Sequence, residues 1–259
     1  MDLHLTDKVA LVAASSTGLG LATARQLAHE GAKVVLCART QADLETAVST
    51  IEADGGTAVA FTTDLLDPTQ IEQLVENVIA EYGRLDILIT NAGGPPGGTF
   101  DTTDTAAWEK GFNLTLMSAV HLIKAALPHL RQSDAPSILT ITSVSVLQPI
   151  AGLLLSNVMR PAVAGLTRTL ALELAADNIR VNAILPGWTG TDRVVHIFED
   201  RAERNNSSVE DEQSGIIQTI PLQRMADPVE FGRAATFLVS PAASYITGVL
   251  LPVDGGSTI

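Results

Sequence analysis

Short apolar runs alternate with longer, helix-like segments along almost the whole chain. Seven runs rich in Val, Ile, Leu and Ala have the character of buried strands, and the segments between them place apolar residues three or four positions apart. The expected strands are 8–13, 33–37, 58–62, 87–90, 137–142, 181–185 and 249–253. The expected helices are 19–30, 41–54, 68–82, 105–130, 162–175 and 228–238. This alternation predicts an α/β fold, with a seven-stranded parallel sheet doubly wound by helices on both faces, in a single domain over residues 1–259.

One segment interrupts the alternation. Residues 194–215 are polar and charged, and they show no clear apolar face. Because ligands of doubly wound sheets bind beyond the carboxyl ends of the strands, this placement indicates a substrate lid; a plain solvated insertion is an equally good interpretation. Pro161 breaks a second pattern, since it disfavours helical geometry at Arg160 and removes a backbone donor. The helix 162–175 is therefore expected to begin or kink at this proline.

The composition excludes several classes of function. The chain has 259 residues with 16 basic and 29 acidic side chains, a net charge of −13, and nucleic-acid binding needs clustered Lys and Arg instead. Cys37 is the only cysteine, which excludes an internal disulfide and a thiolate metal cluster, and no metal site is expected. The N-terminus lacks the pattern of a signal peptide, and no apolar run approaches membrane-spanning length. We therefore expect a cytoplasmic protein without membrane association.

A glycine-containing turn, Ala-Ala-Ser-Ser-Thr-Gly-Leu-Gly over residues 13–20, joins the first strand to the first helix. The free N–H groups and the dipole at such a helix start favour the pyrophosphate of a dinucleotide. Gly18 lets the backbone approach phosphate, and Gly20 lets the helix pack closely on the strand. The turn therefore predicts a Rossmann-type dinucleotide site formed by Ala14, Ser16, Thr17, Gly18, Leu19 and Gly20.

This turn resembles the Thr-Gly-x-x-x-Gly-x-Gly loop of the short-chain dehydrogenases/reductases, with Ala13 and Ala14 at the Thr and first Gly positions. Other motifs of that family follow in order along nearly all of the chain, which closely resembles the 3-oxoacyl carrier-protein reductase branch. The resemblance implies further cofactor contacts from Asp64, Leu65, Asn91, Ala92, Gly93, Pro186, Gly187, Thr189 and Thr191. It also identifies Asp254-Gly255-Gly256 with the closing turn of the family.

The end of the second strand indicates which dinucleotide is used. A carboxylate there would accept hydrogen bonds from an unphosphorylated ribose, but the chain has Ala38-Arg39-Thr40. The guanidinium of Arg39, supported by Thr40, can instead bind a 2′-phosphate with paired donors. This favours NADP(H) over NAD(H); the alternative is that Arg39 is only a solvated surface residue.

The reaction centre departs from the family pattern. Family members use a Tyr to move the proton, a Lys four residues later to bind the ribose, a Ser thirteen residues before the Tyr, and an Asn on an earlier helix. The matching positions here hold Ser156, Arg160, Ser143 and Asn113. Arg160 can still donate to ribose hydroxyls, but an aliphatic hydroxyl at 156 is a far weaker acid than a phenol, whose pKa is about 10. The resemblance thus predicts an intact cofactor site without the usual proton donor.

Two functions remain open at this point. One is an NADP(H)-dependent oxidoreductase for a small carbonyl or alcohol substrate, in which water, the substrate, or Ser143 with Asn113 delivers the proton. The other is a catalytically inactive NADP(H)-binding protein, a sensor or a structural partner. Neither Tyr82 nor Tyr245 is placed to replace the missing phenol. The resemblance also implies a homo-oligomer, either a dimer or a homotetramer.

Overall fold

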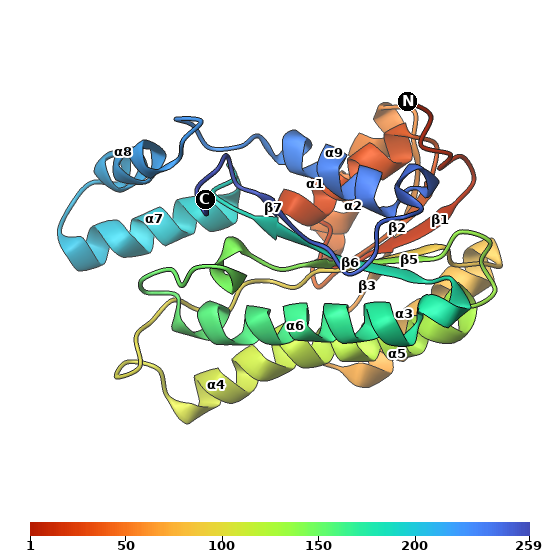
Figure 1. Cartoon of the computed structure of the whole chain (residues 1–259), viewed down its shortest axis with the longest axis horizontal. Coiled ribbons are helices and arrows are strands. Elements are labelled where there is room, and N and C mark those ends of the chain that lie inside the picture. Colours follow the sequence, from red (N-terminus) through yellow and green to blue (C-terminus); the bar gives the residue numbers. More distant parts are fainter.

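The computed structural model describes residues 1–259, which form one α/β domain around a seven-stranded sheet (Figure 1). The strand order is β3-β2-β1-β4-β5-β6-β7, and every neighbouring pair is parallel. The strands are β1 Val9–Val12, β2 Lys33–Ala38, β3 Thr57–Thr62, β4 Ile87–Thr90, β5 Ser137–Ile141, β6 Arg180–Pro186 and β7 Leu250–Val253. The predicted fold class is confirmed.

Helices cover both faces of the sheet. On one face lie α1 Gly18–His29, α2 Gln41–Ala53 and α9 Pro228–Val239; on the other lie α3 Pro68–Tyr82, α4 Thr105–Phe112, α5 Ser118–Leu130 and α6 Leu154–Glu173 (Figure 1). Central strands such as β1 and β4 are buried along their whole length, because both of their faces pack on helices. None of the helices is both long and apolar enough to cross a membrane.

Two helical expectations are corrected. The helix around Pro161 begins at Leu154 and runs through the proline without a break, so α6 starts eight residues earlier than expected. A side-chain clamp supports its first turn: Ile150 N donates to Asn157 Oδ1 (3.0 Å), and Asn157 Nδ2 donates to Ile150 O (2.8 Å). The helix expected over 105–130 contains a π-helical turn, Asn113–Met117, between α4 and α5.

The polar segment 194–215 is helical and does have an apolar side. Apart from the connection 206–208, it lies within α7 Asp192–Asn205 and α8 Val209–Thr219, which sit beyond the carboxyl ends of the strands (Figure 1). Phe198 and Ala202 are buried, and the Phe198 ring stacks on Trp188 with centroids 5.4 Å apart. The expectation that this segment lacks an apolar face is therefore wrong. Two buried residues on an otherwise charged helix are enough to attach α7 to the domain, because the Trp188 ring packs against Phe198.

Candidate functional site

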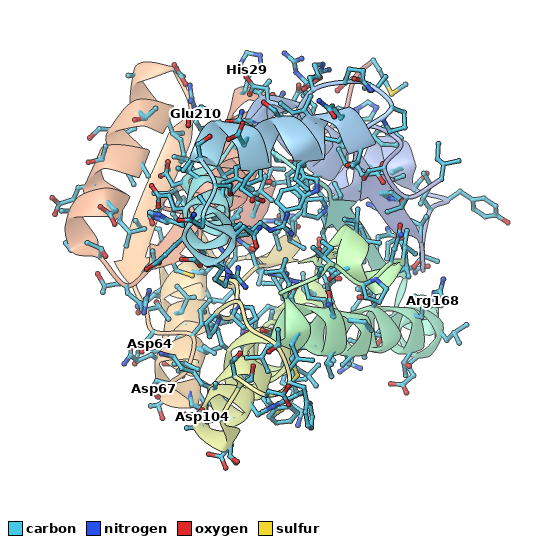
Figure 2. All side chains as sticks on the ribbon, turned by 90° about the vertical axis from the view of Figure 1, so that its left-hand side faces the viewer. His29, Asp64, Asp67, Asp104, Arg168 and Glu210 are labelled. Carbon is cyan, nitrogen blue, oxygen red and sulfur yellow. The ribbon has the colours of Figure 1, made fainter.

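The candidate site lies at the carboxyl edge of the sheet, the edge that faces the viewer in Figure 2. Strands β1, β4, β5 and β6 end there and lead into the segments 13–17, 91–98, 142–153 and 187–191. The carboxyl ends of parallel strands meet at one edge of a sheet, so residues far apart in sequence come together. Helices α7 and α8 lie over the same edge.

The glycine-containing turn has a tight and partly strained backbone. Gly18 has φ +58°, and Ala14 has φ +47°, a left-handed conformation that L-residues rarely adopt. A Cβ on Gly20 would lie 2.3 Å from the Ala14 carbonyl oxygen and 2.9 Å from Ser15 Cα, so helix and turn leave no room for a side chain. Asn91 Nδ2 donates to the same Ala14 oxygen at 3.1 Å. The turn thus accommodates Ala14 by a left-handed backbone, and Asn91 holds it in place.

Ser15 is a structural residue of the turn that the sequence reasoning missed. Its side chain is fully buried, and its Oγ donates to Val12 O (2.7 Å) and accepts from Cys37 N (3.2 Å). The Ser15 backbone N–H also donates to Cys37 O at 3.1 Å. Ser15 therefore fastens the turn to the end of β2, where the residues for cofactor choice follow.

Most of the groups expected to contact the cofactor phosphates and the adenosine are exposed or half-buried. Thr17 is the N-cap of α1, yet its side chain makes no capping hydrogen bond, which leaves the first N–H groups of the helix without a side-chain acceptor. Arg39 and Thr40 are exposed, and Arg39 makes no hydrogen bond or ion pair. Asp64 accepts from Leu66 N with one carboxylate oxygen at 3.0 Å, and it is labelled at the same edge in Figure 2. Ser16, Gly18 and Leu19 are half-buried, and Leu65 is buried.

The loops after β4 and β6 border the same region. Gly93 is exposed, and a Cβ there would meet nothing within 4 Å, so its backbone borders open space next to the half-buried Asn91 and Ala92. A Cβ on Gly187, the residue after Pro186, would lie 2.7 Å from Asp254 Cβ, because the 186–187 turn packs on the C-terminal turn. Thr189 Oγ1 is buried without a hydrogen-bond partner, and the Thr191 methyl lies 3.8 Å from where a Gly18 Cβ would be.

Taken together, these features fit a dinucleotide. Gly20 lets the start of α1 pack directly on the 13–17 turn, the first N–H groups of α1 have no side-chain acceptor, and the loop after β6, which carries the unpaired Thr189 hydroxyl, brings Thr191 next to Gly18. Of the four buried hydroxyls without a partner, Thr189 is the one on the loop after β6, where a bound dinucleotide could pair with it.

Three serine hydroxyls gather at the end of β5. Ser143 caps a short 3₁₀ turn, Val144–Val146, and its Oγ accepts from Ser145 N at 3.1 Å, so its own hydroxyl proton stays free to donate. Ser156, in the first turn of α6, has its Oγ 3.5 Å from Ser145 Oγ, a contact at the limit of a hydrogen bond. Ser145 itself is buried, and the sequence reasoning missed it, although it lies only two residues after Ser143.

Arg160 points to the same strand end. Its Nη1 donates to Ile141 O at 3.0 Å. Burial, and then the positive charge of Arg193, lower the pKa of Arg160 to about 10, so the guanidinium remains charged at neutral pH. Arg193, on the first turn of α7, donates from Nη2 to Pro95 O at 2.7 Å. Arg193 is, after Ser15 and Ser145, the third residue of the site that sequence reasoning did not identify.

The structure does not join Asn113 to these groups. Asn113 begins the π-helical turn, its side chain is exposed and makes no hydrogen bond, and its backbone oxygen accepts from Ser118 N. A π-turn within an α-helix is a frequent mark of a functional region. Neither tyrosine is present at the site: Tyr82 ends α3, and Tyr245 is fully exposed before β7.

Three comparisons with known proteins agree on one family. A family model described as enoyl-(acyl carrier protein) reductase matches residues 13–258. Dehydrogenase/reductase SDR family member 4 from Oryctolagus cuniculus is 36% identical over 255 residues, covering 98% of this chain and 94% of that protein. L-Sorbose reductase from Gluconobacter frateurii, solved with NADPH and L-sorbose, superposes with a TM-score of 0.94 at 31% identity, covering 100% of this chain and 99% of that one.

A further solved structure is relevant to the reaction centre. An NADPH-bound short-chain oxidoreductase from Pseudomonas aeruginosa PAO1, described as containing an atypical catalytic center, is 32% identical, with a TM-score of 0.87 and coverage of 97% of this chain and 98% of that one. The cofactor that these solved neighbours contain is NADPH.

Proposed function

Because the chain belongs to the short-chain dehydrogenase/reductase family, we propose that it is an NADP(H)-dependent oxidoreductase of a carbonyl or alcohol substrate whose proton does not come from a tyrosine. The observation that carries the proposal is the turn at 13–20, where Gly20 has no space for a Cβ and the start of α1 has no side-chain cap. When bound there, NADPH would supply the hydride for a carbonyl carbon.

The preference for NADP(H) rests on Arg39. It follows β2 directly, is exposed, and has no carboxylate partner, so its guanidinium is free to bind a 2′-phosphate. A competing carboxylate for a ribose hydroxyl is missing from residues 38–40. The NADPH present in two solved neighbours supports the same choice.

At the reaction centre, the residues of this chain would orient and polarise the substrate. Ser143 has a free hydroxyl proton, and Arg160 uses one N–H on Ile141 O while it keeps further donors for a substrate oxygen or a ribose hydroxyl. Neither group is an acid of suitable strength, so the proton comes ultimately from the solvent, through water at the Ser143 hydroxyl. General acid catalysis contributes about 10²–10⁴-fold, and the enzyme is expected to be slower than a tyrosine-containing relative by a factor within that range.

Helices α7 and α8 would act as the substrate lid. The stacking of Phe198 on Trp188 anchors α7 to the loop after β6, and Arg201 lies 5.1 Å above the Trp188 ring. Arg201 Nη2 also reaches Ala151 O at 3.4 Å, across the site. We further propose that the protein assembles as a homo-oligomer, as the family resemblance implies.

A catalytically inactive NADP(H)-binding protein is the second candidate. Two observations favour it: Ser156 lies against Ser145 rather than Ser143, and Asn113 hydrogen-bonds to none of these serines. In this alternative the cofactor is a structural or sensed ligand.

Two measurements separate the candidates. NADPH and NADH affinities are measured by quenching of tryptophan fluorescence, with Arg39→Gln as a variant; NADPH should bind more tightly, and Arg39→Gln should remove the preference. NADPH oxidation is then followed with a panel of ketones and aldehydes for the natural chain and for the Ser156→Tyr/Arg160→Lys double variant. Tight binding without turnover over the whole panel would contradict the oxidoreductase and favour the second candidate. Strong activity only in the double variant would show that the cofactor site works and that proton delivery limits the natural chain.

A further inference from the structure

Helix α7 presents three arginines to the two loops that border the site. Arg193 Nη2 donates to Pro95 O at 2.7 Å, and its guanidinium lies so close to Gly94 that a Cβ there would be 3.0 Å from Arg193 Nε. Arg201 reaches Ala151 O, and Arg204 Nη1 would lie 3.1 Å from a Cβ on Gly152. The two loops are themselves joined, since Gly98 N donates to Gly152 O at 2.8 Å. Arginines of α7 thus reach both loops around the reaction centre.

These arginines, and Arg160, have no carboxylate in contact. The chain forms nine ion pairs, and none involves residues 160, 193, 201 or 204, although acidic residues outnumber basic ones by 29 to 16. Asp200 and Glu212 act on Arg193 and Arg201 only at longer range. The charged group that most affects Arg160 is another cation, Arg193. Two partly buried like charges that act on each other without a counter-ion are unfavourable.

The backbone contacts do not neutralise this charge. Arg160 and Arg193 each give one N–H to a carbonyl oxygen, and a guanidinium has five N–H donors in a rigid plane. The carbonyls fix the orientation of both groups and leave further donors free. Fixed, planar donors with a net positive charge match a carboxylate, which accepts two parallel hydrogen bonds.

We propose that the substrate carries a carboxylate, and that Arg160 and Arg193 bind it beside the carbonyl or alcohol that reacts. This rests on the proposed oxidoreductase function, and it defines the substrate class as a small oxo acid or the matching hydroxy acid. A bound carboxylate relieves the repulsion between Arg160 and Arg193, and this relief adds to the free energy of substrate binding. Arg201 holds α7 over the site through Trp188 and Ala151.

The test compares acids with their methyl esters, which keep the carbonyl and lose the charge. 2-Oxobutanoate, acetoacetate and their methyl esters are titrated by calorimetry into protein saturated with NADP⁺, so that no turnover is needed. The natural chain should bind the acids at least about tenfold more tightly than the esters, as expected for charge-assisted paired hydrogen bonds. Arg193→Gln should abolish that ratio, and Arg193→Lys should keep part of it because the charge remains.

Arg168→Gln is the matched control. Arg168 is an exposed arginine of α6 without an ion pair, and Figure 2 shows it on the outer side of the molecule, away from α7. This variant should retain the acid preference. Loss of the preference in both variants would mean a general charge effect and overturn the proposal, as would equal binding of acids and esters to the natural chain.

The cofactor phosphates are a second source of anions, and a separate titration distinguishes them. If Arg193→Gln weakens NADPH binding about tenfold and leaves the acid-to-ester ratio unchanged, Arg193 pairs with the cofactor and the substrate assignment is wrong. If the proposed oxidoreductase function is wrong but the carboxylate site is real, the acids bind with the expected preference and NADPH is not oxidised. Turnover of esters and acids alike would preserve the function and overturn the substrate class.

Discussion

Replacement of Ala14 by glycine should stabilise the protein, although Ala→Gly substitutions normally destabilise. Ala14 has φ +47°, and the left-handed region costs an L-residue about 1–2 kcal/mol. Glycine removes that cost but makes the unfolded chain more flexible, which offsets about 0.5–1 kcal/mol. The Asn91 hydrogen bond to the Ala14 oxygen involves the backbone and is retained. The net expectation for Ala14→Gly is a gain of about 0.5–1 kcal/mol in the free energy of unfolding.

Urea unfolding followed by tryptophan fluorescence measures this gain, at fixed protein concentration because oligomerisation would shift the midpoint. A gain of this size corresponds to a rise in Tm of about 1–4 °C for a chain of this length. Ala80→Gly is the matched control, because Ala80 is exposed within α3 and its helical backbone needs no glycine. The control should lose up to about 1 kcal/mol.

The free energy of unfolding should therefore rise in Ala14→Gly and fall in Ala80→Gly. If Ala14→Gly destabilises as much as Ala80→Gly does, the left-handed turn is not strained and the reasoning fails. NADPH affinity should stay the same or increase in Ala14→Gly, since the glycine can hold the same turn without its strain. A marked loss of affinity would mean that the alanine side chain contributes a contact to the cofactor.

Three further variants or treatments test the fold around the site. Pro161→Ala should stabilise the protein by up to about 3 kcal/mol, because an alanine N–H can bond to the Asn157 carbonyl inside α6; an unchanged urea midpoint would argue against this. Arg180→Lys should cost about 3 kcal/mol, since a single ammonium cannot replace donors to Leu238 O, Val239 O, Ser240 O and Ile246 O, and calorimetric unfolding should show a lower Tm. Burial raises the pKa of Cys37 to about 12 against 9.0 for a free thiol. Between these two values the folded state keeps the thiol proton and the unfolded state loses it, so the free energy of unfolding falls as pH rises from about 9 to about 12. At mildly alkaline pH, iodoacetamide should therefore react only with unfolded protein, and mass spectrometry detects the alkylated Cys37.

Much of the fold could be predicted because its signals are local. A strand such as β1, Val-Ala-Leu-Val, is apolar on both faces, and α3 begins at Asp67-Pro68 and ends at Gly83 with φ +71°, which are ordinary helix-start and helix-end signals. Helix α7 was not predicted because a residue outside the helix, Trp188, provides the contact that holds it on the domain. Its apolar side is small, and the ring that covers Phe198 belongs to a loop ten residues earlier. Helical periodicity within one segment does not report such a contact.

The start of α6 shows a different limit. Proline disfavours the helix at the residue before it, yet residue 160 is helical here. The Asn157 amide fastens the first turn to Ile150 through two hydrogen bonds, and Leu155 and Met159 bury themselves against the domain. These tertiary contacts outweigh the local preference of the proline, and only the folded chain reveals them.

The site residues divide in the same way. Gly18, Gly20 and Asn91 follow from motifs with fixed spacing, whereas Ser145 and Arg193 come into the site through folding alone. Arg193 lies 33 residues after Arg160 in sequence, directly before the charged segment 194–215, and only the packing of α7 brings its charge close enough to lower the pKa of Arg160.

The changes at 156 and 160 therefore have to be considered together with α7. A tyrosine that donates a proton needs a hydroxyl near the substrate oxygen, and Ser156 is turned instead towards the buried Ser145. The arginine at 160 adds a charge that stays on at neutral pH, and Arg193 adds a second. A site with two fixed cations and no strong acid is suited to hold an anionic substrate and stabilise an oxygen that becomes negative, while water supplies the proton. With the proposed oxo-acid substrate, restoring Tyr and Lys alone should not simply recover an ordinary reductase, because Lys at 160 would remove paired donors for the carboxylate at the same time as Tyr supplies the acid. The double variant should consequently gain activity towards neutral ketones and lose affinity for oxo acids.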